Sequence, residues 1–487
     1  MNNPSSKRHS AFCILHSALV VALCATTGCL VGPDFERPET DLPASYLPGT
    51  LAGAATNLSA DASWWRSFDD PVLATLVEAG LDANLGVQQA VQRVRASRAA
   101  LASSKAAFWP NIGLSAGVTK GKSWNPDDST TRASAGFDAS WEIDLFGGLR
   151  RGAEAARADL AATEYALSDA RLSLAAEIAG EYVTLRRLQA EYEIALANLA
   201  IQTNFHAIAE AKFNAGMADE RDRIASEAQW RALEASLPES RAAIQQSIRR
   251  IEALLGLNPG LLDESLAQPL PVPAAPSLPA SAPADLLRRR PDVRQAESRY
   301  AAALARVGVA VANRYPSISL GAGASVSSDS LSDWGEAVKS VSFGPSVKWS
   351  ILDFGRGKAK VEQARATAEE ATLQYRETVL SAVHEVETDW MKLREERARY
   401  KPLVKADELQ ARALGLSEDM YAKDLGEYQE VLSSQQALLS ARRALVQQKA
   451  NCTLHAIALY KALGGAPAQD HVEEDGEEVH DRAGQHE

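Results

Sequence analysis

Three short patterns in the 487-residue sequence could carry enzyme or metal chemistry. Residues 113–117 (GLSAG) match the G-x-S-x-G pattern of serine hydrolases, in which the serine stands on a strand-to-helix turn. Here the pattern lies inside a segment that alternates like a strand, and so we expect no nucleophile. His384-Glu385 lacks the second histidine of a zinc-binding H-E-x-x-H helix. The acidic C-terminal segment holds three histidines that could bind a metal weakly, although a solvated tail is the simpler interpretation: His471, His480 and His486. We therefore expect no enzyme activity, no cofactor and no metal site.

The N-terminus has the features of an export signal. Two cations, Lys7 and Arg8, precede an apolar run over 11–23, and small residues follow up to Gly28. This order predicts a secretory signal peptide over 1–28. A small residue directly before a cysteine is typical of a bacterial lipobox, so Cys29 is predicted to become the N-terminal residue and to carry acyl chains. An ordinary signal peptide that contains a cysteine is the alternative.

The cysteine count agrees with export. Of the four cysteines, Cys13 and Cys24 lie in the segment to be removed, and Cys29 would be acylated. Only Cys452 remains, inside an apolar helical pattern, where a buried inert thiol is expected. No intrachain disulfide and no cysteine metal site is therefore expected in the mature chain.

Composition excludes several classes of protein. Apolar residues make up 46% of the chain and charged residues 23%, which is typical of a folded protein. The net charge of −12 argues against a nucleic-acid partner, because such proteins usually present a basic face. No apolar run of about 20 residues occurs after the signal, so no membrane-spanning helix is expected. The tail over 466–487 is strongly acidic and is predicted to be disordered.

The body of the chain is a tandem repeat. Residues 141–147 (WEIDLFG) fall on 349–355 (WSILDFG) at an offset of 208, whereas 109–112 fall on 315–318 at 206. A proline-rich stretch separates the halves. The expected organisation is an N-terminal extension with an equatorial segment over 29–70, a first repeat over 71–256, a linker over 257–290 and a second repeat over 291–465.

Each repeat predicts helix, strand, loop, strand and long helix. Residues 153–213 and 358–401 contain almost no glycine or proline and read as long coiled-coil or bundle helices. The hairpins, about 111–144 and 316–351, alternate apolar residues with small or polar ones. Alternation over about 10 residues fits transmembrane β-strands, although a soluble half-buried hairpin would show it too. The predicted class is an α+β membrane protein. Three charged residues stand on the small-residue face and are predicted to line a pore: Asp138, Glu142 and Lys348.

Four strands cannot form a membrane barrel alone, because open sheet edges leave backbone groups unsatisfied in lipid. Two chains would give eight strands, whose interior side chains would fill. Three chains would give twelve strands with room for water. A homotrimer is therefore the smallest assembly that we expect to hold a pore.

Several motifs resemble one family. They are CLVGPDFERP at 29–38, WRSFDDPVL at 65–73, LLRRRPDVR at 286–294 and YKALGG at 460–465. Together they resemble the lipoprotein branch of TolC-like outer-membrane factors, the OprM/NodT type. The resemblance implies a trimeric channel of twelve β-strands and twelve helical strands, lipid-anchored in the outer membrane of a Gram-negative type bacterium, with a periplasmic tunnel. It also implies two partners, a periplasmic adaptor (membrane fusion protein) and an inner-membrane transporter, often of the RND type.

The resemblance places a gate at the periplasmic mouth of the tunnel. The family pattern Arg-Tyr-x-x-Gly…Tyr-x-x-Val-Leu corresponds to 420–432 here, where Met420 and Asp424 replace the usual arginine and glycine. Residues 213–217 (FNAGM) with Asp222 are the first-half equivalent. The predicted gate residues are Asp419, Tyr421, Asp424 and Glu430. Solvated charges on a helix turn are the alternative for the acidic ones.

The sequence thus predicts a passive export channel of a tripartite efflux system for drugs, metals or other small solutes. A structural coiled-coil lipoprotein of the envelope is the alternative. The four alternating strands favour the channel, since a spacer has no use for them.

Overall fold

The computed structural model describes residues 29–38, 45–46, 63–122, 129–276, 282–283, 289–329, 337–423 and 425–465. The predicted signal peptide, the acidic tail and Asp424 lie outside the described residues. The chain folds into two compact units, each of which is described by itself. The first combines 84–170 and 292–384 with the N-terminal segment, and the second combines 44–83, 171–291 and the chain from Glu385.

The tandem repeat is visible in the bounds of the elements. The equivalent pairs are α3 (Leu85–Ala106) with α8 (Pro291–Ala312), β2 (Asn111–Lys122) with β5 (Ser317–Ser328), α4 (Gly148–Asn214) with α9 (Arg356–Ala422), and α5 (Glu220–Leu255) with α10 (Tyr428–Ala462). The first two pairs begin 206 residues apart, and the last two begin 208 apart. The two extra residues therefore lie in the second hairpin, between the start of β5 and the start of α9.

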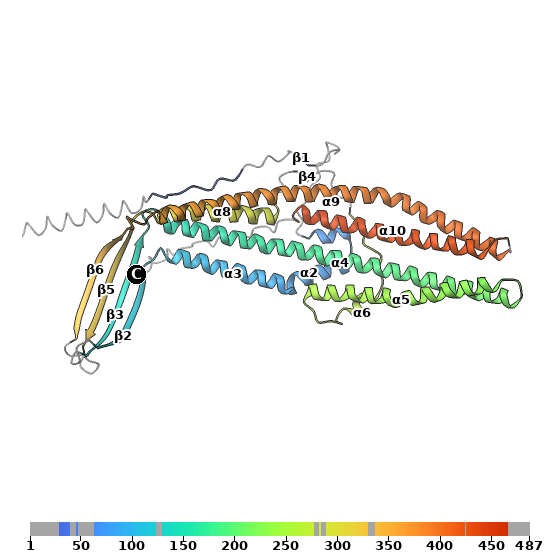
Figure 1. Cartoon of the computed structure of the whole chain (residues 1–487), viewed down its shortest axis with the longest axis horizontal. Helices are drawn as coiled ribbons and strands as arrows, with labels where there is room; N and C mark the ends of the chain where they lie inside the picture. The colour runs from blue at the N-terminus through green and yellow to red at the C-terminus, as the bar shows by residue number, and fades with distance from the viewer. Residues whose placement is uncertain are drawn as a thin grey trace, which may run out of the picture. The chain divides into compact units, whose positions relative to one another are not determined.

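The first unit contains a four-stranded antiparallel sheet in the order β2-β3-β5-β6, with β3 over Ser129–Ile143 and β6 over Val338–Lys348 (Figure 1). Leu114 lies opposite Phe137, Phe137 opposite Ala324, and Ala324 opposite Val341. Residues directly opposite share a face of a sheet, so the apolar positions of all four strands form one continuous face. The β3–β5 pairing joins the first repeat to the second.

Helices of the first unit pack through small residues and peripheral ion pairs. Ala303 and Val307 of α8 form a buried cluster with Ala368 of α9. Arg306 Nη2 of α8 lies 2.5 Å from Asp159 Oδ2 of α4, which ties the second repeat to the first. Small residues at the contact allow helix axes to approach closely.

The second unit is a helical bundle that comprises η1 (Trp64–Phe68), α2 (Pro71–Ala83), α5, α6 (Asp263–Ala267), α10 and the C-terminal parts of α4 and α9. A two-residue bridge, β1 (Ser45–Tyr46) with β4 (Ala282–Pro283), also belongs to it. The buried Arg186 donates from Nη1 to the Gln268 carbonyl oxygen at 2.9 Å. Trp64 stacks on Tyr460, with ring centroids 5.5 Å apart.

The second long helix extends beyond the glycine-free and proline-free range 358–401 that indicates it in the sequence. α9 continues through Pro402 to Ala422. Proline in a helix interior removes one backbone donor and costs about 3 kcal/mol. The helix continues because packed residues follow the proline, among them the buried Leu414 and Tyr421. Among the described residues, no helix is both long and apolar enough to cross a membrane.

Candidate functional site

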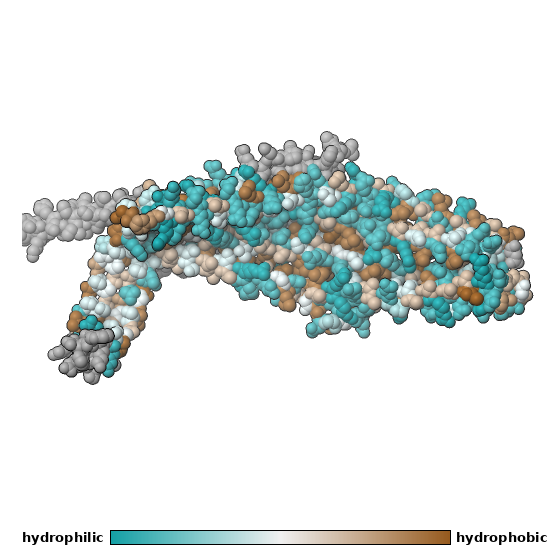
Figure 2. Space-filling model, in the orientation of Figure 1, coloured by the Kyte–Doolittle hydropathy of each residue, from teal (hydrophilic) through white to brown (hydrophobic). Residues whose placement is uncertain are grey.

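The sheet exposes an apolar face. Val341 keeps 84% of its surface exposed, Phe343 75% and Ile112 72%. In Figure 2 the strands carry mostly white and light brown residues, whereas teal residues are frequent over the helices. An apolar face of this extent marks a surface that some apolar medium or partner covers. The alternation that the sequence predicts on these strands is therefore confirmed as two chemically distinct faces.

The opposite face is built from serine, glycine and a few charges. Asp138 lies over Gly113, since a Cβ added at Gly113 would stand 3.0 Å from Asp138 Oδ2. Glu142 pairs with Ser319 across the β3–β5 ladder, and Lys348 is opposite Ser317. The register thus places the three charged residues predicted for a pore on one small-residue face. Their role as pore-lining residues stays a prediction.

Two tryptophans fix the junction between strands and helices in the same way in each repeat. Trp141 Nε1 donates to the Phe108 carbonyl oxygen at 2.9 Å, and Trp349 Nε1 donates to the Arg314 carbonyl oxygen at 3.1 Å. The exposed Trp109 follows Phe108 directly. Amphipathic rings with a satisfied N–H are typical of a level where apolar and aqueous media meet.

The segment after Cys29 is bound to this junction. The buried Arg151 of α4 donates from Nη2 to Asp34 Oδ1 at 2.6 Å and from Nε to the Val31 carbonyl oxygen at 3.2 Å. Gly32 adopts a φ of 95°, and a Cβ there would stand 2.4 Å from Gly308 Cα, so no other residue fits. Cys29 is exposed. Sequence reasoning missed Arg151 and Gly308, because the adjacent Arg150 and the nearby Arg157 leave nothing in the local sequence that singles out Arg151.

The tip of the second helical hairpin, which α9 and α10 form, has an aromatic core. Tyr421 is the residue before the last in α9, and Tyr428 begins α10. Both are buried, and their ring centroids lie 5.9 Å apart. Phe205 of α4 packs against Tyr428 at 6.3 Å, and Val431 is fully buried beside them. Figure 1 shows the turns of both helical hairpins at the right-hand end. Tyr421, predicted as a gate residue, is therefore a core residue of the tip.

Polar contacts tie the second hairpin to α4. The fully buried Gln202 donates from Nε2 to the Tyr428 hydroxyl at 2.7 Å. Burial raises the pKa of Tyr428, so its hydroxyl stays protonated. Lys212 Nζ lies 4.1 Å from the centroid of the Tyr421 ring and donates to the Tyr421 carbonyl oxygen at 3.3 Å. These contacts hold α9 and α10 against the first repeat.

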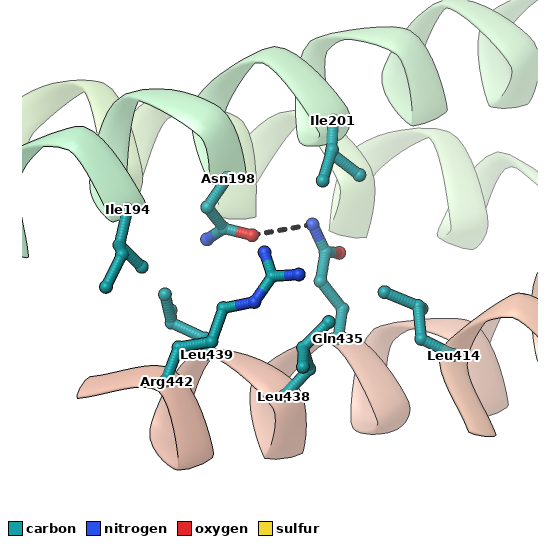
Figure 3. A pocket seen from close by; sticks show the side chains of 8 residues that line it. All are labelled: Ile194, Asn198, Ile201, Leu414, Gln435, Leu438, Leu439 and Arg442. Carbon is teal, nitrogen blue, oxygen red and sulfur yellow. Dashed lines mark hydrogen bonds between the residues drawn. The ribbon is translucent and has the colours of Figure 1, made fainter. Parts of the chain in front are cut away.

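A buried amide pair extends the contact between α4 and α10, called here the α4–α10 seam, further along the bundle. Gln435 Nε2 of α10 donates to Asn198 Oδ1 of α4 at 2.8 Å (Figure 3). Arg442 points into the same space, and its Nε lies 3.7 Å from Asp407 Oδ1. The lining residues surround a cavity of about 20 Å³. Buried amides in an apolar helix contact fix the register of the packed helices.

The acidic residues predicted for the gate differ from Tyr421. Asp419 and Glu430 are exposed, and Asp424 lies outside the described residues. Their neighbour Glu418 is half-buried, and burial together with the charge of Asp419 raises its pKa. The structure thus keeps the Asp419 and Glu430 side chains at the surface of the tip, around an aromatic core. A gating role for them stays a prediction.

The motifs that carry the family resemblance have structural tasks. Arg290 donates from Nη1 to the Ala462 carbonyl oxygen at 2.5 Å and from Nη2 to Glu385 Oε2 at 2.7 Å, which caps the end of α10. Gly464 has a φ of 89° and packs against the Arg290 backbone. Arg37 Nε lies 2.6 Å from Glu297 Oε1. These motifs hold helix ends and the N-terminal segment in place.

The serine of the G-x-S-x-G pattern stands inside a strand and not on a strand-to-helix turn, and the three tail histidines lie outside the described residues. Ser115 lies within β2, and its hydroxyl donates to the Gly136 carbonyl oxygen of β3 at 3.5 Å. Among the residues that the structure describes, no three His, Cys, Asp or Glu side chains are grouped to hold a metal ion. Cys452 is buried, and burial raises the pKa of its thiol.

A sheet with one apolar and one small polar face, together with long helical hairpins, defines the outer-membrane channel class. A solved structure of the outer-membrane channel OprN superposes with a TM-score of 0.82 at 33% identity, over 90% of this chain and 99% of that one. Residues 76–257 and 282–465 match the model of the outer membrane efflux protein family, and the chain belongs to this family. It is a transport channel for efflux and not an enzyme.

Two curated relatives match this chain over nearly their whole length. Nodulation protein T of Rhizobium leguminosarum bv. trifolii is 31% identical over 436 residues, which cover 86% of this chain and 91% of the relative. The cation efflux system protein CusC of Escherichia coli (strain K12) is 27% identical over 452 residues, which cover 91% of this chain and 97% of the relative.

Proposed function

We propose that three copies of the chain form the outer-membrane channel of a tripartite efflux system. The observation that carries the proposal is the two-faced sheet. Its apolar face suits lipid, and its serine and glycine face suits water. The strands would form a twelve-stranded barrel in the outer membrane, and the helical hairpins would form a tunnel in the periplasm.

The edges of the sheet support the proposed number of copies. β2 and β6 are its outer strands, and their free backbone groups need partners in lipid. Twelve strands leave water-filled space inside, whereas eight strands would be filled by side chains. Asp138, Glu142 and Lys348 would then project into that space.

The N-terminal segment supports a lipid anchor at Cys29. Val31 N donates to the Phe146 carbonyl oxygen at 3.4 Å, just before α4 begins. A Cβ added at Gly147 would stand 2.5 Å from Leu30 Cδ1. Cys29 is thus held beside the end of the sheet, where acyl chains on its sulfur and amine would reach the membrane that the strands cross.

The hairpin tips are the proposed docking site of the periplasmic adaptor. Met217 keeps 67% of its surface exposed and Leu425 71%, and the two positions are equivalent in the repeats. Three copies would present six such apolar side chains in a ring. The aromatic core and the acidic residues Asp419, Asp424 and Glu430 would form the gate beside it.

The cargo is proposed only as a class. The relatives' names point to different cargoes: CusC is a cation efflux system protein, and SrpC of Pseudomonas putida is a solvent efflux pump outer membrane protein. We infer that this channel passes drugs, metals or other small solutes. An inner-membrane transporter, of the RND type, would select them.

The test is the mass of the purified protein in detergent together with its conductance in a planar bilayer. A trimer that conducts ions supports the proposal. A stable monomer, or a trimer without conductance, contradicts the channel and favours a structural lipoprotein of the envelope.

A second experiment separates the anchor from the barrel. Cys29→Ser blocks acylation, and we expect the variant to remain in the outer-membrane fraction because its strands hold it there. Acylation is read from the mass of the mature wild type. A folded but wholly soluble variant would contradict the membrane role of the strands.

A further inference from the structure

We propose that β6 of one copy pairs with β2 of a second copy in the register that β3 and β5 already show, and that Phe354 stacks on Trp109 of that second copy. The inference rests on the proposed trimer and specifies its contact surface. It follows from the repeat, because β6 is the equivalent of β3 and β2 is the equivalent of β5.

The register can be transferred residue by residue. Asp138 lies opposite Gly323 and Trp141 lies opposite Leu320. Adding 208 to the β3 residue and subtracting 206 from the β5 residue places Ser346 opposite Gly117. The same shift places Trp349 opposite Leu114. In the half of the junction nearer the helices, apolar residues meet apolar residues (Val347 with Ala116, Pro345 with Val118), so both faces of the sheet continue there. In the other half, the shift places Phe343 opposite Lys120 and Val341 opposite Lys122.

An aromatic contact marks the same junction. Phe146, after β3, stacks on Tyr315, just before β5, with ring centroids 4.6 Å apart and planes 14° apart. The equivalents are Phe354, which is 91% exposed, and Trp109, which is 76% exposed. The two exposed rings of one chain are therefore the two halves of the contact that the repeats make inside it.

The long helices show the same missing neighbour. Of the 23 residues over 148–170 of α4, only Arg157 is exposed, whereas 15 of the equivalent 23 over 356–378 of α9 are exposed. α4 packs against α8 of the second repeat, through Arg151 against Gly308 and Arg306 with Asp159. The equivalent partner of α9 is α3 of a second copy.

The contact has to join different edges of two copies. Pairing of β2 with β2, or of β6 with β6, would close a two-fold dimer and leave two edges free. Pairing of β6 with β2 repeats the same contact around a ring and leaves no edge. Only the second arrangement satisfies every backbone group of the sheet in lipid.

The register is tested by disulfide cross-linking of the full-length protein in outer membranes, with Cys452→Ser as background. The predicted pair is Gly117→Cys with Ser346→Cys; an added Cβ at Gly117 meets nothing within 4 Å. Directly opposite residues have Cβ atoms about 4.5–5.5 Å apart, whereas positions two residues away are about 7–8 Å apart, beyond disulfide reach. We expect covalent dimers and trimers after oxidation.

Two controls keep Gly117→Cys and move the second cysteine by two residues, to Gly344→Cys or to Lys348→Cys. Both stay on the same face, and we expect them to lose the covalent trimer. Asp138→Cys with Gly323→Cys should cross-link within one chain and leave its mass unchanged. Each single variant should give no ladder.

The outcomes separate the register from the trimer. A trimer by mass that cross-links only through a shifted pair overturns the proposed register and leaves the channel intact. A monomer by mass overturns both. As a second readout, Phe354→Ala and Trp109→Ala should each lower the temperature at which the trimer dissociates, and the double variant should lower it no further than the stronger single one. Additive losses would overturn the stacking.

Discussion

The two helical hairpins match in length to within one residue and have the same spacing, but their tips differ in chemistry. In the second hairpin, Tyr428 and Gln435 are buried against α4. The equivalent positions of the first hairpin are Glu220 and Glu227, which carry charge; Glu220 is exposed. The same backbone arrangement therefore gives a closed apolar seam between α10 and α4 in the second hairpin and a charged surface on α5 in the first.

This difference indicates where the proposed gate is strong. Within one chain, α4 and α10 are joined by the bond from Gln202 to Tyr428 and by the amide pair. If neighbouring copies pack against each other as the two repeats of one chain do, the equivalent of the α4–α10 contact joins α9 of one copy to α5 of the next. Gln410 of α9 would then face Glu220 of α5. We expect the seam between copies to open first, because it has no aromatic core. A substitution in one hairpin can therefore be compared with the substitution at the equivalent position of the other.

The largest effect is expected from Tyr428→Ala. Removing a large buried aromatic side chain costs about 3–5 kcal/mol. The cost falls on the contact between α10 and α4, so the tip should open and single-channel conductance in a planar bilayer should rise. The melting temperature of the trimer in detergent should fall.

The matched control is Glu220→Ala in the first hairpin. Its side chain is exposed, and we expect conductance and melting temperature close to wild type. Equal effects of the two variants would show that the tips do not differ in the way their burial suggests.

A smaller effect is expected from Gln202→Leu. The Tyr428 hydroxyl then loses its donor inside an apolar core, and an unsatisfied buried polar group costs about 1–3 kcal/mol. The free energy of unfolding in denaturant should fall by that amount, and conductance should rise less than in Tyr428→Ala. Gln410→Leu is the control, and a loss as large as that of Gln202→Leu would contradict the difference between the seams.

The sequence predicts the local features of both hairpins and little of their contacts. Alternation on the strands and the offsets of 206 and 208 are periodic signals, and each predicts faces and element bounds well. The bond from Gln202 to Tyr428 spans 226 positions, and the bond from Arg151 to Asp34 spans 117. No local period encodes such pairs. Tyr421 was identified by family resemblance, which gave its place in the tip but not its burial.

The acidic residues of the second tip are expected to set ion selectivity without setting stability. Three-fold symmetry would turn each exposed carboxylate into a ring of three, which favours cations. Asp424→Asn with Glu430→Gln should weaken cation selectivity and block by multivalent cations, measured as the reversal potential across a salt gradient. The control is Asp222→Asn, the first-hairpin equivalent of Glu430. Unchanged selectivity in the double variant would place the selective ring elsewhere.

The smallest effect concerns pH and Glu418. Burial, with the nearby charge of Asp419, raises the pKa of Glu418 in the folded protein above its unfolded value of about 4.3. The folded state therefore binds this proton more tightly, and the stabilisation is lost as pH rises through the raised pKa. Glu418→Gln keeps the neutral form, so it should raise the melting temperature at pH 7 and leave it unchanged near pH 4.

The equivalent residue of the first hairpin is Glu210, which is exposed and followed by alanine instead of aspartate. Glu210→Gln should therefore change the melting temperature at neither pH, and a rise at pH 7 as large as that of Glu418→Gln would show that general surface charge, rather than the burial of Glu418, is responsible.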